Sequence, residues 1–382
     1  MINCNLNTLN GISTPCYLYD LSLLRETLSV IRKEIEGCPF VVHYAVKANY
    51  NPVILEEIRK AGLGVDLVSG NEIKAALDAG FDARQMAFAG VGKADWEIET
   101  ALDNDIFCIN VESEEELEVI NAIAATKGKV ASVALRVNPD IDAHTHKFIT
   151  TGTQDNKFGI HLSRLDEVVD KAVAMTNIHL MGLHFHIGSQ ITTIEPYATL
   201  CDKINELVAH FESKGVNFEL IDAGGGLGVD YEKPEQNSIA HFHDFFKLFK
   251  AKLKVKPGQI VHFELGRSIV AQCGALISRV LFVKNAPSKR FVILDAGMTD
   301  LLRPALYGAN HKIINLTSQA QEHEKYDVVG PICESSDVFG KDLLLPVTKR
   351  GDLVAILSAG AYGESMASRY NMRSLPQCHF IE

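Results

Sequence analysis

Between about residues 41 and 265, short apolar segments alternate with amphipathic ones, and this alternation limits the possible fold more than any other feature of the sequence. Eight apolar segments have the length and composition of buried β-strands: HYAVKA (43–48), GVDLV (64–68), MAFAG (86–90), IFCINV (106–111), VALRV (133–137), GLHFHI (182–187), FELID (218–222) and VHFEL (261–265). Segments between them have helical periodicity, for example NPVILEEIRKAG and SEEELEVINAIAATKG. Strands that alternate with helices form a parallel sheet, and eight such units predict a closed (β/α)8 barrel.

The pattern changes after about residue 268. Short β-rich runs are now separated by Gly, Pro and Asp turns without comparable helices: ALISRVLFV (275–283), RFVILDAG (290–297), YDVVGPIC (326–333) and DLVAILSAG (352–360). This texture predicts a β-sandwich or small β-barrel. PCYLYD (15–20) is another short strand, which we expect to join that domain. The predicted domains are therefore a barrel over residues 25–267 and a β-domain from residues 1–24 with 268–382.

Composition excludes several classes of function. The net charge of −11 and the lack of a basic patch argue against nucleic acid as the main partner. No apolar run approaches the roughly 20 residues of a membrane span, and the start MINCNLNTLNG lacks the features of a secretion signal. We therefore expect a cytoplasmic protein, in which the eight cysteines, none in a C-x-x-C pair, are free thiols.

One connection is unusually long. Residues 138–162 follow the strand VALRV and show little regular pattern. Long loops in compact domains are usually functional, and this one leaves the C-terminal end of its strand, where barrel enzymes place their active sites. We expect a lid or mobile segment here.

Polar residues recur at the C-terminal ends of the predicted strands, namely Lys47, Asp66, Arg136 with Asn138, His186, Gly224 to Gly226, and Glu264 with Arg267. Any one of them alone is more often simply solvated, but in a barrel all these ends converge on one mouth. The stretch DAGGGLGVD (222–230) leaves backbone N–H groups open for an anion such as phosphate, although a tight turn also explains its glycines. Arg267 would add a fixed charge to the same phosphate.

These groups suit pyridoxal 5'-phosphate. A desolvated lysine such as Lys47 forms a Schiff base with an aldehyde, and a flat histidine can stack on a ring. A carboxylate can keep the pyridine nitrogen protonated, which makes the ring an electron sink. The alternative is a metal-dependent hydrolase, because His184 and His186 point to one face of their strand. That alternative needs further His and Asp ligands, whereas the other strand ends offer Lys, Gly, Glu and Arg, so no metal is expected. His144, His146, His241 and His243 are expected at the surface.

Several motifs resemble the diaminopimelate decarboxylases: YAVKAN, GVDLVSGNEI, GLHFHIGSQ, DAGGGLGVDY, ELGRSIV, DAGMTDLLRPALYGANH, VVGPICESSD and GAYGESMASRYN. These are fold-type III pyridoxal-phosphate enzymes with an alanine-racemase-like barrel and a C-terminal β-domain. The resemblance extends from about residue 12 to 376. YAVKAN recurs across the wider decarboxylase group, whereas RPALYGANH together with GPICES is the narrower mark.

The resemblance implies a cofactor site made of Lys47, His186, Ser189, Gly225, Gly226, Glu264, Arg267 and Tyr362. Lys47 would hold the cofactor as a Schiff base, His186 would stack on its ring, and Glu264 would pair with the pyridine nitrogen. The glycines and Arg267 would lie against the phosphate.

The resemblance also implies substrate contacts from Arg267, Arg303, Tyr307, Glu334 and Tyr362. Arg303 and Tyr307 would bind the substrate carboxylate, and Glu334 would recognise the distal amino-acid end. Cys333 would donate the proton after loss of CO2. Since the Cys–Glu pair comes from the partner subunit in this family, the resemblance implies a homodimer with shared active sites. The implied reaction converts meso-2,6-diaminopimelate to L-lysine and CO2, the last step of lysine biosynthesis.

Three departures from the family pattern affect the fine positioning of the site residues. Leu265 replaces the proline of E-P-G-R, Ser336 replaces a glycine after C-E-S, and the end RSLPQCHFIE is unusual. The nearest alternatives are decarboxylases of ornithine, arginine or carboxynorspermidine. The ornithine type typically carries Asp after the cysteine, and an alanine racemase places Arg at the pyridine nitrogen, which Glu264 opposes. A cofactor carrier without turnover is a further alternative, but such proteins are usually single barrels.

Overall fold

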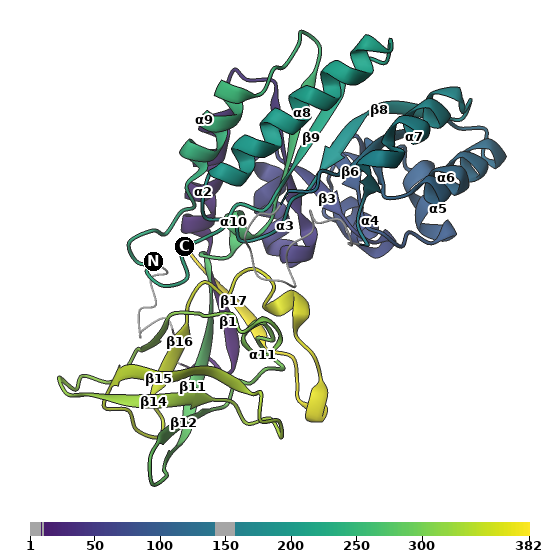
Figure 1. Ribbon diagram of the computed structural model, residues 1–382. Helices are drawn as coiled ribbons and strands as arrows, with labels where there is room; N and C mark the ends of the chain where they lie inside the picture. The colour runs from purple at the N-terminus through teal and green to yellow at the C-terminus, as the bar shows by residue number, and fades with distance from the viewer. Residues whose placement is uncertain (1–8, 10, 142–156) are drawn as a thin grey trace. The chain divides into compact units, whose positions relative to one another are not determined.

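The computed structural model describes residue 9 and residues 11–141 and 157–382 (Figure 1). The chain forms two compact units. The barrel unit comprises Leu28–Gly228 and His241–Gly266. The β-unit comprises the described part of Met1–Thr27 together with Val229–Ala240 and Arg267–Glu382.

The barrel unit contains a closed parallel sheet of eight strands, which confirms the predicted (β/α)8 barrel. The strands are β2 (Phe40–Ala45), β3 (Gly64–Leu67), β4 (Met86–Phe88), β5 (Cys108–Val111), β6 (Ala131–Asn138), β8 (Ile178–Phe185), β9 (Leu220–Gly225) and β10 (Ile260–Leu265). Each pairs with the next in this order, and β10 closes the ring by pairing with β2. The short β7 (Ile160–His161) adds to β6. All eight predicted apolar segments are strands of this ring.

Helices alternate with these strands, as Figure 1 shows. They are α2 (Leu21–Ile35), α3 (Pro52–Lys60), α4 (Gly70–Asp78), α5 (Asp95–Asp103), α6 (Glu114–Thr126), α7 (Leu162–Ala174), α8 (Glu195–Ser213) and α9 (Phe242–Lys252). Local chemistry sets their ends. For example, the Ser113 side chain accepts a hydrogen bond from the Glu116 backbone N–H at the start of α6. After its C-terminal end, Gly128 has φ +61°, a conformation that favours glycine.

Side chains along each barrel strand alternate between the helices outside the barrel and its interior. On β10, Phe263 packs against the phenylalanines of α9, with ring centroids 4.9 Å from Phe249 and 5.2 Å from Phe246. Because successive residues of a strand point to opposite faces, Glu264 points into the barrel. Leu265 still pairs with Tyr44 of β2 and is buried, so β10 keeps its pairing without the family's usual proline.

The β-unit is built on a mostly antiparallel sheet, which confirms the predicted β-domain. Its strands are β1 (Cys16–Asp20), β11 (Gly274–Asn285), β12 (Arg290–Leu294), β13 (Ile313–Asn315), β14 (His323–Val329), β15 (Val338–Pro346), β16 (Leu353–Ile356) and β17 (Gln377–Ile381). The order is β13-β16-β11-β12-β14-β15, and β1 pairs with β11 and β17, as expected for the PCYLYD segment. Two short helices, α10 (Arg267–Val270) and α11 (Arg303–Tyr307), interrupt this sheet-forming sequence.

The segment Val229–Ala240 belongs to the β-unit, although the sequence analysis included it in the barrel. The domain boundaries predicted from sequence, 25–267 and 1–24 with 268–382, stay a prediction. Of the expected lid, residues 142–156 lie outside the described residues, as do His144 and His146. His241 and His243 are exposed, as expected. Among the described helices, none has the length and apolar character needed to cross a membrane.

Candidate active site

A cavity of about 430 Å³ opens at the C-terminal ends of the barrel strands. It is lined by Lys47, Val68, Ala89, Gly90, Val91, Gly92, Arg136, Phe158, His184, His186 and Glu264. Apart from Phe158, which precedes β7, these residues lie at or near the C-terminal ends of β2, β3, β4, β6, β8 and β10. Of the polar residues that the sequence predicted to converge on one mouth, the cavity is lined by Lys47, Arg136, His186 and Glu264.

Lys47 lies in a single 3-10 turn (Val46–Ala48) directly after β2. Its Nζ atom is 3.3 Å from Oδ2 of Asp66, and its side chain is 39% exposed whereas that of Asp66 is fully buried. Burial and the nearby carboxylate of Glu264 raise the pKa of Asp66 to about 7, and Lys47 opposes this rise. The amine is thus held at the cavity by a carboxyl group that has few other contacts: Asp66 Oδ1 has no hydrogen-bond partner among the described residues.

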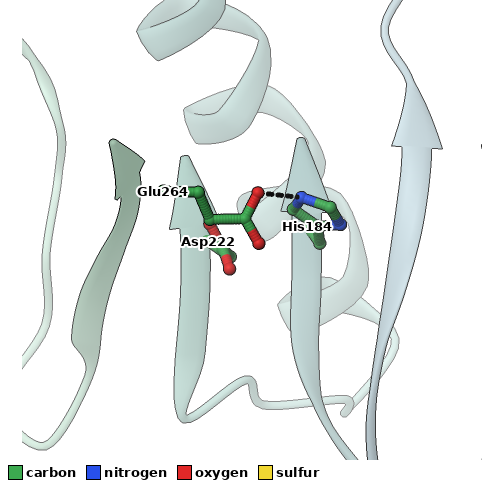
Figure 2. A group of neighbouring side chains, drawn as sticks. All are labelled: His184, Asp222 and Glu264. Atoms are coloured by element: carbon green, nitrogen blue, oxygen red, sulfur yellow. Dashed lines mark hydrogen bonds and ion pairs between the residues drawn. The ribbon is translucent and has the colours of Figure 1, made fainter. Parts of the chain in front are cut away.

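Glu264 is held from two sides inside the barrel. Its Oε1 accepts a hydrogen bond from Asn110 Nδ2 at 3.0 Å, and its Oε2 lies 3.1 Å from Nε2 of His184 (Figure 2). Burial alone would raise the pKa of Glu264, but the charges and hydrogen bond of His184, with Lys47, bring it below its ordinary value. Glu264 therefore stays ionised although it is buried.

His184, Asp222 and Glu264 form a buried cluster whose ligand atoms lie within 4.8 Å of one another (Figure 2). Such a set can ligate a metal in principle. Burial would lower the pKa of His184, but the carboxylates of Glu264 and Asp222 raise it above its ordinary value. Burial and Glu264 raise the pKa of Asp222 well above its usual range. The cluster is therefore best described as a hydrogen-bonded His184–Glu264 pair beside Asp222, in which Nε2 of His184 donates to Glu264.

His186 is half-buried at the rim of the cavity, and its Nδ1 accepts a hydrogen bond from the Gly225 backbone N–H at 3.4 Å. Burial, with the positive charges of Arg136 and Lys47, lowers the pKa of His186 to about 3. The ring is therefore neutral at physiological pH. Ser189 follows in the same connection and is also half-buried.

The glycines after β9 are required by close backbone packing. A Cβ atom on Gly225 would lie 1.8 Å from the Glu264 carbonyl oxygen, and one on Gly226 (φ +96°) would lie 2.3 Å from that of Gly188. Both positions therefore exclude larger residues whether or not an anion binds there. Their predicted contact with a phosphate stays a prediction.

In the β-unit, two arginines gather around Tyr231. Arg267 Nη1 donates to Tyr231 Oη at 2.8 Å, and the Arg303 guanidinium carbon lies 4.7 Å from the centroid of the Tyr231 ring. Burial would raise the pKa of Tyr231, but these two guanidiniums bring it below its usual value. The Arg267 guanidinium carbon also lies 4.9 Å from the ring centroid of Tyr362, a residue with φ +55°. The result is a concentration of buried positive charge suited to anions.

His311 holds Arg303 in place. Its Nδ1 donates to the Leu357 carbonyl oxygen at 2.9 Å, so its Nε2 accepts from Arg303 Nη1 at 2.7 Å. Burial and the charge of Arg303 lower the pKa of His311 to about 3, which keeps the ring an acceptor. Tyr307, on the same short helix as Arg303, is half-buried.

Cys333 and Glu334 differ from the other predicted residues because both are exposed. The Cys333 backbone N–H donates to Asn371 Oδ1 at 3.2 Å, and Tyr370 Oη donates to Glu334 Oε1 at 2.6 Å. The Cys333 thiol is free. These residues form a surface of the β-unit.

Sequence reasoning missed four residues that contact the predicted ones, namely Asn110, Asp222, Tyr231 and His311. A signal existed for each. Asn110 is a polar residue inside the apolar strand IFCINV, and His311 ends the family motif RPALYGANH. Asp222 and Tyr231 begin and end the glycine-rich stretch DAGGGLGVDY. What the sequence did not show is which side chain each would contact.

Comparisons with known proteins agree with the geometry. Residues 21–271 match the family model for the pyridoxal-binding domain of pyridoxal-dependent decarboxylases. A diaminopimelate decarboxylase of Bacteroides thetaiotaomicron is 56% identical over 367 residues, which cover 96% of this chain and 95% of the relative. The enzyme of that name from Aquifex aeolicus is 41% identical, over 94% of this chain and 84% of the relative.

Solved structures give the same result. The crystal structure of Helicobacter pylori diaminopimelate decarboxylase complexed with L-lysine matches with a TM-score of 0.93 and 40% identity, over 99% of this chain and 94% of that one. A lysine/ornithine decarboxylase of Vibrio vulnificus, at 22% identity and TM-score 0.84, shares the fold. Family model, full-length identity and fold agree, and the chain belongs to the diaminopimelate decarboxylases within the pyridoxal-dependent decarboxylase family.

Proposed function

We propose that this chain catalyses the pyridoxal-phosphate-dependent decarboxylation of meso-2,6-diaminopimelate to L-lysine and CO2. The observation that carries the proposal is the cavity where Lys47 and the ionised Glu264 meet, in a chain 56% identical to a diaminopimelate decarboxylase over 96% of its length. The related Helicobacter pylori enzyme was crystallised with L-lysine, the product of this reaction.

The donor set of the cavity fits pyridoxal phosphate. Lys47 offers an amine beside Asp66, Glu264 offers a buried ionised acceptor, and His186 offers a flat neutral ring. When bound, the cofactor supplies an aldehyde for amines and a protonated ring that takes up the electrons of the breaking C–C bond. In this proposal Lys47 binds the aldehyde, Glu264 accepts the ring N–H, and His186 with Ser189 borders the ring.

The charged groups of the β-unit suit the anionic parts of cofactor and substrate. We assign the phosphate to Arg267 with the backbone of Gly225 and Gly226, and the substrate carboxylate to Arg303, with Arg267, Tyr307 and Tyr362. Guanidinium groups match carboxylate and phosphate oxygens because their N–H groups are arranged in a fixed fork. The concentration of positive charge around Tyr231 supports this assignment.

We further propose that the enzyme is a homodimer, in which Cys333 protonates the substrate α-carbon and Glu334 binds the distal amino group of the partner's substrate. The exposed surface around this pair supports the proposal. Tyr370 is 49% exposed and Met372 97% exposed, and Asn371 and Met372 have φ of +54° and +58°. Large exposed apolar side chains on a strained segment are typical of a surface that a partner covers. The cytoplasmic location expected from the sequence remains a proposal.

The test is CO2 release from meso-diaminopimelate, ornithine, arginine and carboxynorspermidine, measured side by side on the purified enzyme with added cofactor. We expect turnover with meso-diaminopimelate to exceed that of the other three by a wide margin. Preferred release from carboxynorspermidine or ornithine would overturn the substrate assignment while keeping the reaction type. A protein that binds no pyridoxal phosphate would overturn both.

A further inference from the structure

The strongest unexplained feature is the pair of contacts that Glu264 makes inside the barrel. Asn110 and His184 approach it from two different strands, β5 and β8, at 3.0 and 3.1 Å. In the closed ring, β5 and β10 are four strands apart, so Asn110 reaches Glu264 from the opposite wall. Figure 2 shows His184, Asp222 and Glu264 on their neighbouring strands. All these side chains are buried.

The amide of Asn110 has a defined orientation. Cys108, two residues earlier on the same strand, donates its thiol to Asn110 Oδ1 at 3.9 Å. Burial, with the carboxylates of Asp222 and Glu264, raises the pKa of the Cys108 thiol, so it keeps its proton. With Oδ1 used in this way, the Nδ2 group of Asn110 is the part that faces Glu264 and donates to it.

A buried carboxylate needs such donors to stay charged, because burial favours the neutral acid. Lys47, Asp66, His186 and Asp222 are among the other titratable groups whose charges act around this carboxylate, together with His43, Cys108 and His262. Asp222 has its own donor, the Gly224 backbone N–H at 2.9 Å, and does not compete for Asn110. Asn110 and His184 thus stabilise the charged form of Glu264 from two sides.

We propose that Asn110 and His184 are positioning residues, which hold Glu264 as an oriented, ionised acceptor for the ring nitrogen of pyridoxal phosphate. The inference rests on the proposed function, since it needs that cofactor in the cavity. It adds two residues to the site: Asn110, which the sequence analysis did not single out, and His184, which the sequence offered only as a metal ligand of the alternative function. Both act through Glu264, so their effect on cofactor binding must depend on the ring nitrogen.

The test compares affinities for pyridoxal phosphate and for its 1-deaza analogue, in which CH replaces the ring nitrogen. We expect Asn110→Leu to weaken binding of pyridoxal phosphate by about tenfold, as for the loss of one hydrogen bond to a charged group. Binding of the deaza analogue should change by less than about twofold, because it offers Glu264 no N–H. In a Glu264→Gln background, Asn110→Leu should cause little further loss of affinity for pyridoxal phosphate, because the charged acceptor is already gone.

His184→Gln is the second variant, because its side-chain amide keeps a donor near the position of Nε2 but cannot carry a positive charge. We expect the affinity of His184→Gln for pyridoxal phosphate to lie between those of wild type and His184→Leu. Affinity for the deaza analogue, which has no ring nitrogen, should change little in both variants. Thermal unfolding of each variant checks that it folds. Equal losses for the two cofactors, in either variant series, would overturn the proposal and leave Asn110 and His184 with a packing role.

The outcome for the wild type separates this inference from the proposed function. A wild-type enzyme that prefers pyridoxal phosphate over the deaza analogue, with variants that keep this preference, contradicts only the roles of Asn110 and His184. A wild-type enzyme that binds both equally contradicts the contact of Glu264 with the nitrogen, and the inference with it. A wild-type enzyme that binds neither contradicts the cofactor assignment itself.

Discussion

The two groups of predicted site residues have opposite surroundings. In the barrel unit, Glu264 is buried and bonded by Asn110 and His184, and its position follows from the pairing of neighbouring strands. In the β-unit, Cys333 and Glu334 are exposed, and their contacts go to Asn371 and Tyr370 of an equally exposed segment.

In the proposed homodimer, this difference would separate the groups that one chain completes from those that the second subunit completes. A carboxylate whose oxygens are already bonded inside the barrel needs no partner to set its charge or direction. An exposed thiol is surrounded by water and has no fixed relation to a reacting carbon, so a proton donor of this kind needs another surface to enclose it. This difference can be tested by removing each group in turn. For each variant, the measurement is whether a second subunit restores the activity that was lost.

The largest effect is expected for Lys47→Ala, which removes the amine at the centre of the barrel site. Turnover should fall on the order of 1,000-fold or more, since Lys47 is the amine that lines the cavity and pairs with Asp66. The visible absorbance of the cofactor-bound protein should disappear as well. Lys60→Ala is the matched control, because Lys60 is exposed and its ion pairs within the described residues are with Glu56 and Glu57. An absorbing, active Lys47→Ala protein would rule out the role proposed for Lys47.

Cys333→Ala should reduce turnover by about 10²- to 10⁴-fold, the usual contribution of a positioned general acid. Cofactor absorbance should stay, since the cofactor residues proposed for the barrel are intact. Steady-state kinetics measures turnover, and absorbance spectra measure bound cofactor. Cys38→Ala, at a half-buried thiol of the barrel unit, serves as control. Unchanged turnover in Cys333→Ala would show that another group delivers the proton.

Mixing the two inactive variants tests the shared active site directly. If Cys333 serves the partner's Lys47, a dimer of one Lys47→Ala and one Cys333→Ala subunit has one site with both groups intact. Random re-pairing should therefore restore about a quarter of the wild-type activity, since about half of the dimers are mixed. Activity is measured after dissociation and reassociation at equal concentrations. No recovery, with mixed dimers present, would contradict the sharing of sites.

A smaller effect is expected at His311, which fixes the orientation of Arg303. His311→Ala should raise KM by about tenfold with little change in kcat, the loss expected when one hydrogen bond to a charged group disappears. His311→Gln should recover part of the loss because its side-chain oxygen can accept from Arg303. His323→Ala, at an exposed histidine of the same unit, should leave both constants unchanged. A fall in kcat alone would place His311 in a different role.

A further effect concerns stability rather than turnover, and it acts through Asp66. Its folded pKa of about 7 lies above the ordinary 3.8, so the folded state binds this proton more tightly than the unfolded chain does. The resulting contribution to the free energy of unfolding is present below about pH 4 and is lost as the pH rises toward 7. Asp66→Asn has no carboxyl group to titrate, so its free energy of unfolding should not fall in this way. Urea unfolding of cofactor-free protein should therefore show the variant becoming more stable relative to wild type as the pH rises from about 4 to 7. A stability difference that stays constant over this range would contradict the raised pKa.

The elements that local patterns encode were predicted well. The eight barrel strands follow from apolar runs. The β-unit was predicted as a β-sandwich or small β-barrel, but its strands β13, β15 and β17 were not predicted. These strands are half-exposed or short, so their apolar content is low and their pairing comes from distant segments.

The sequence by itself determined the barrel, the β-rich second part and the presence of Lys47, His186 and Glu264 at strand ends, because strand and helix periodicity are local properties of the chain. Family motifs added the residues of the β-unit. Only the tertiary structure decided that Asn110 and His184 hold Glu264, that Tyr231 lies between two arginines, and that His311 accepts from Arg303. Most of these contacts join residues distant in sequence, and the charges of the groups depend on burial, which forms only when the chain folds.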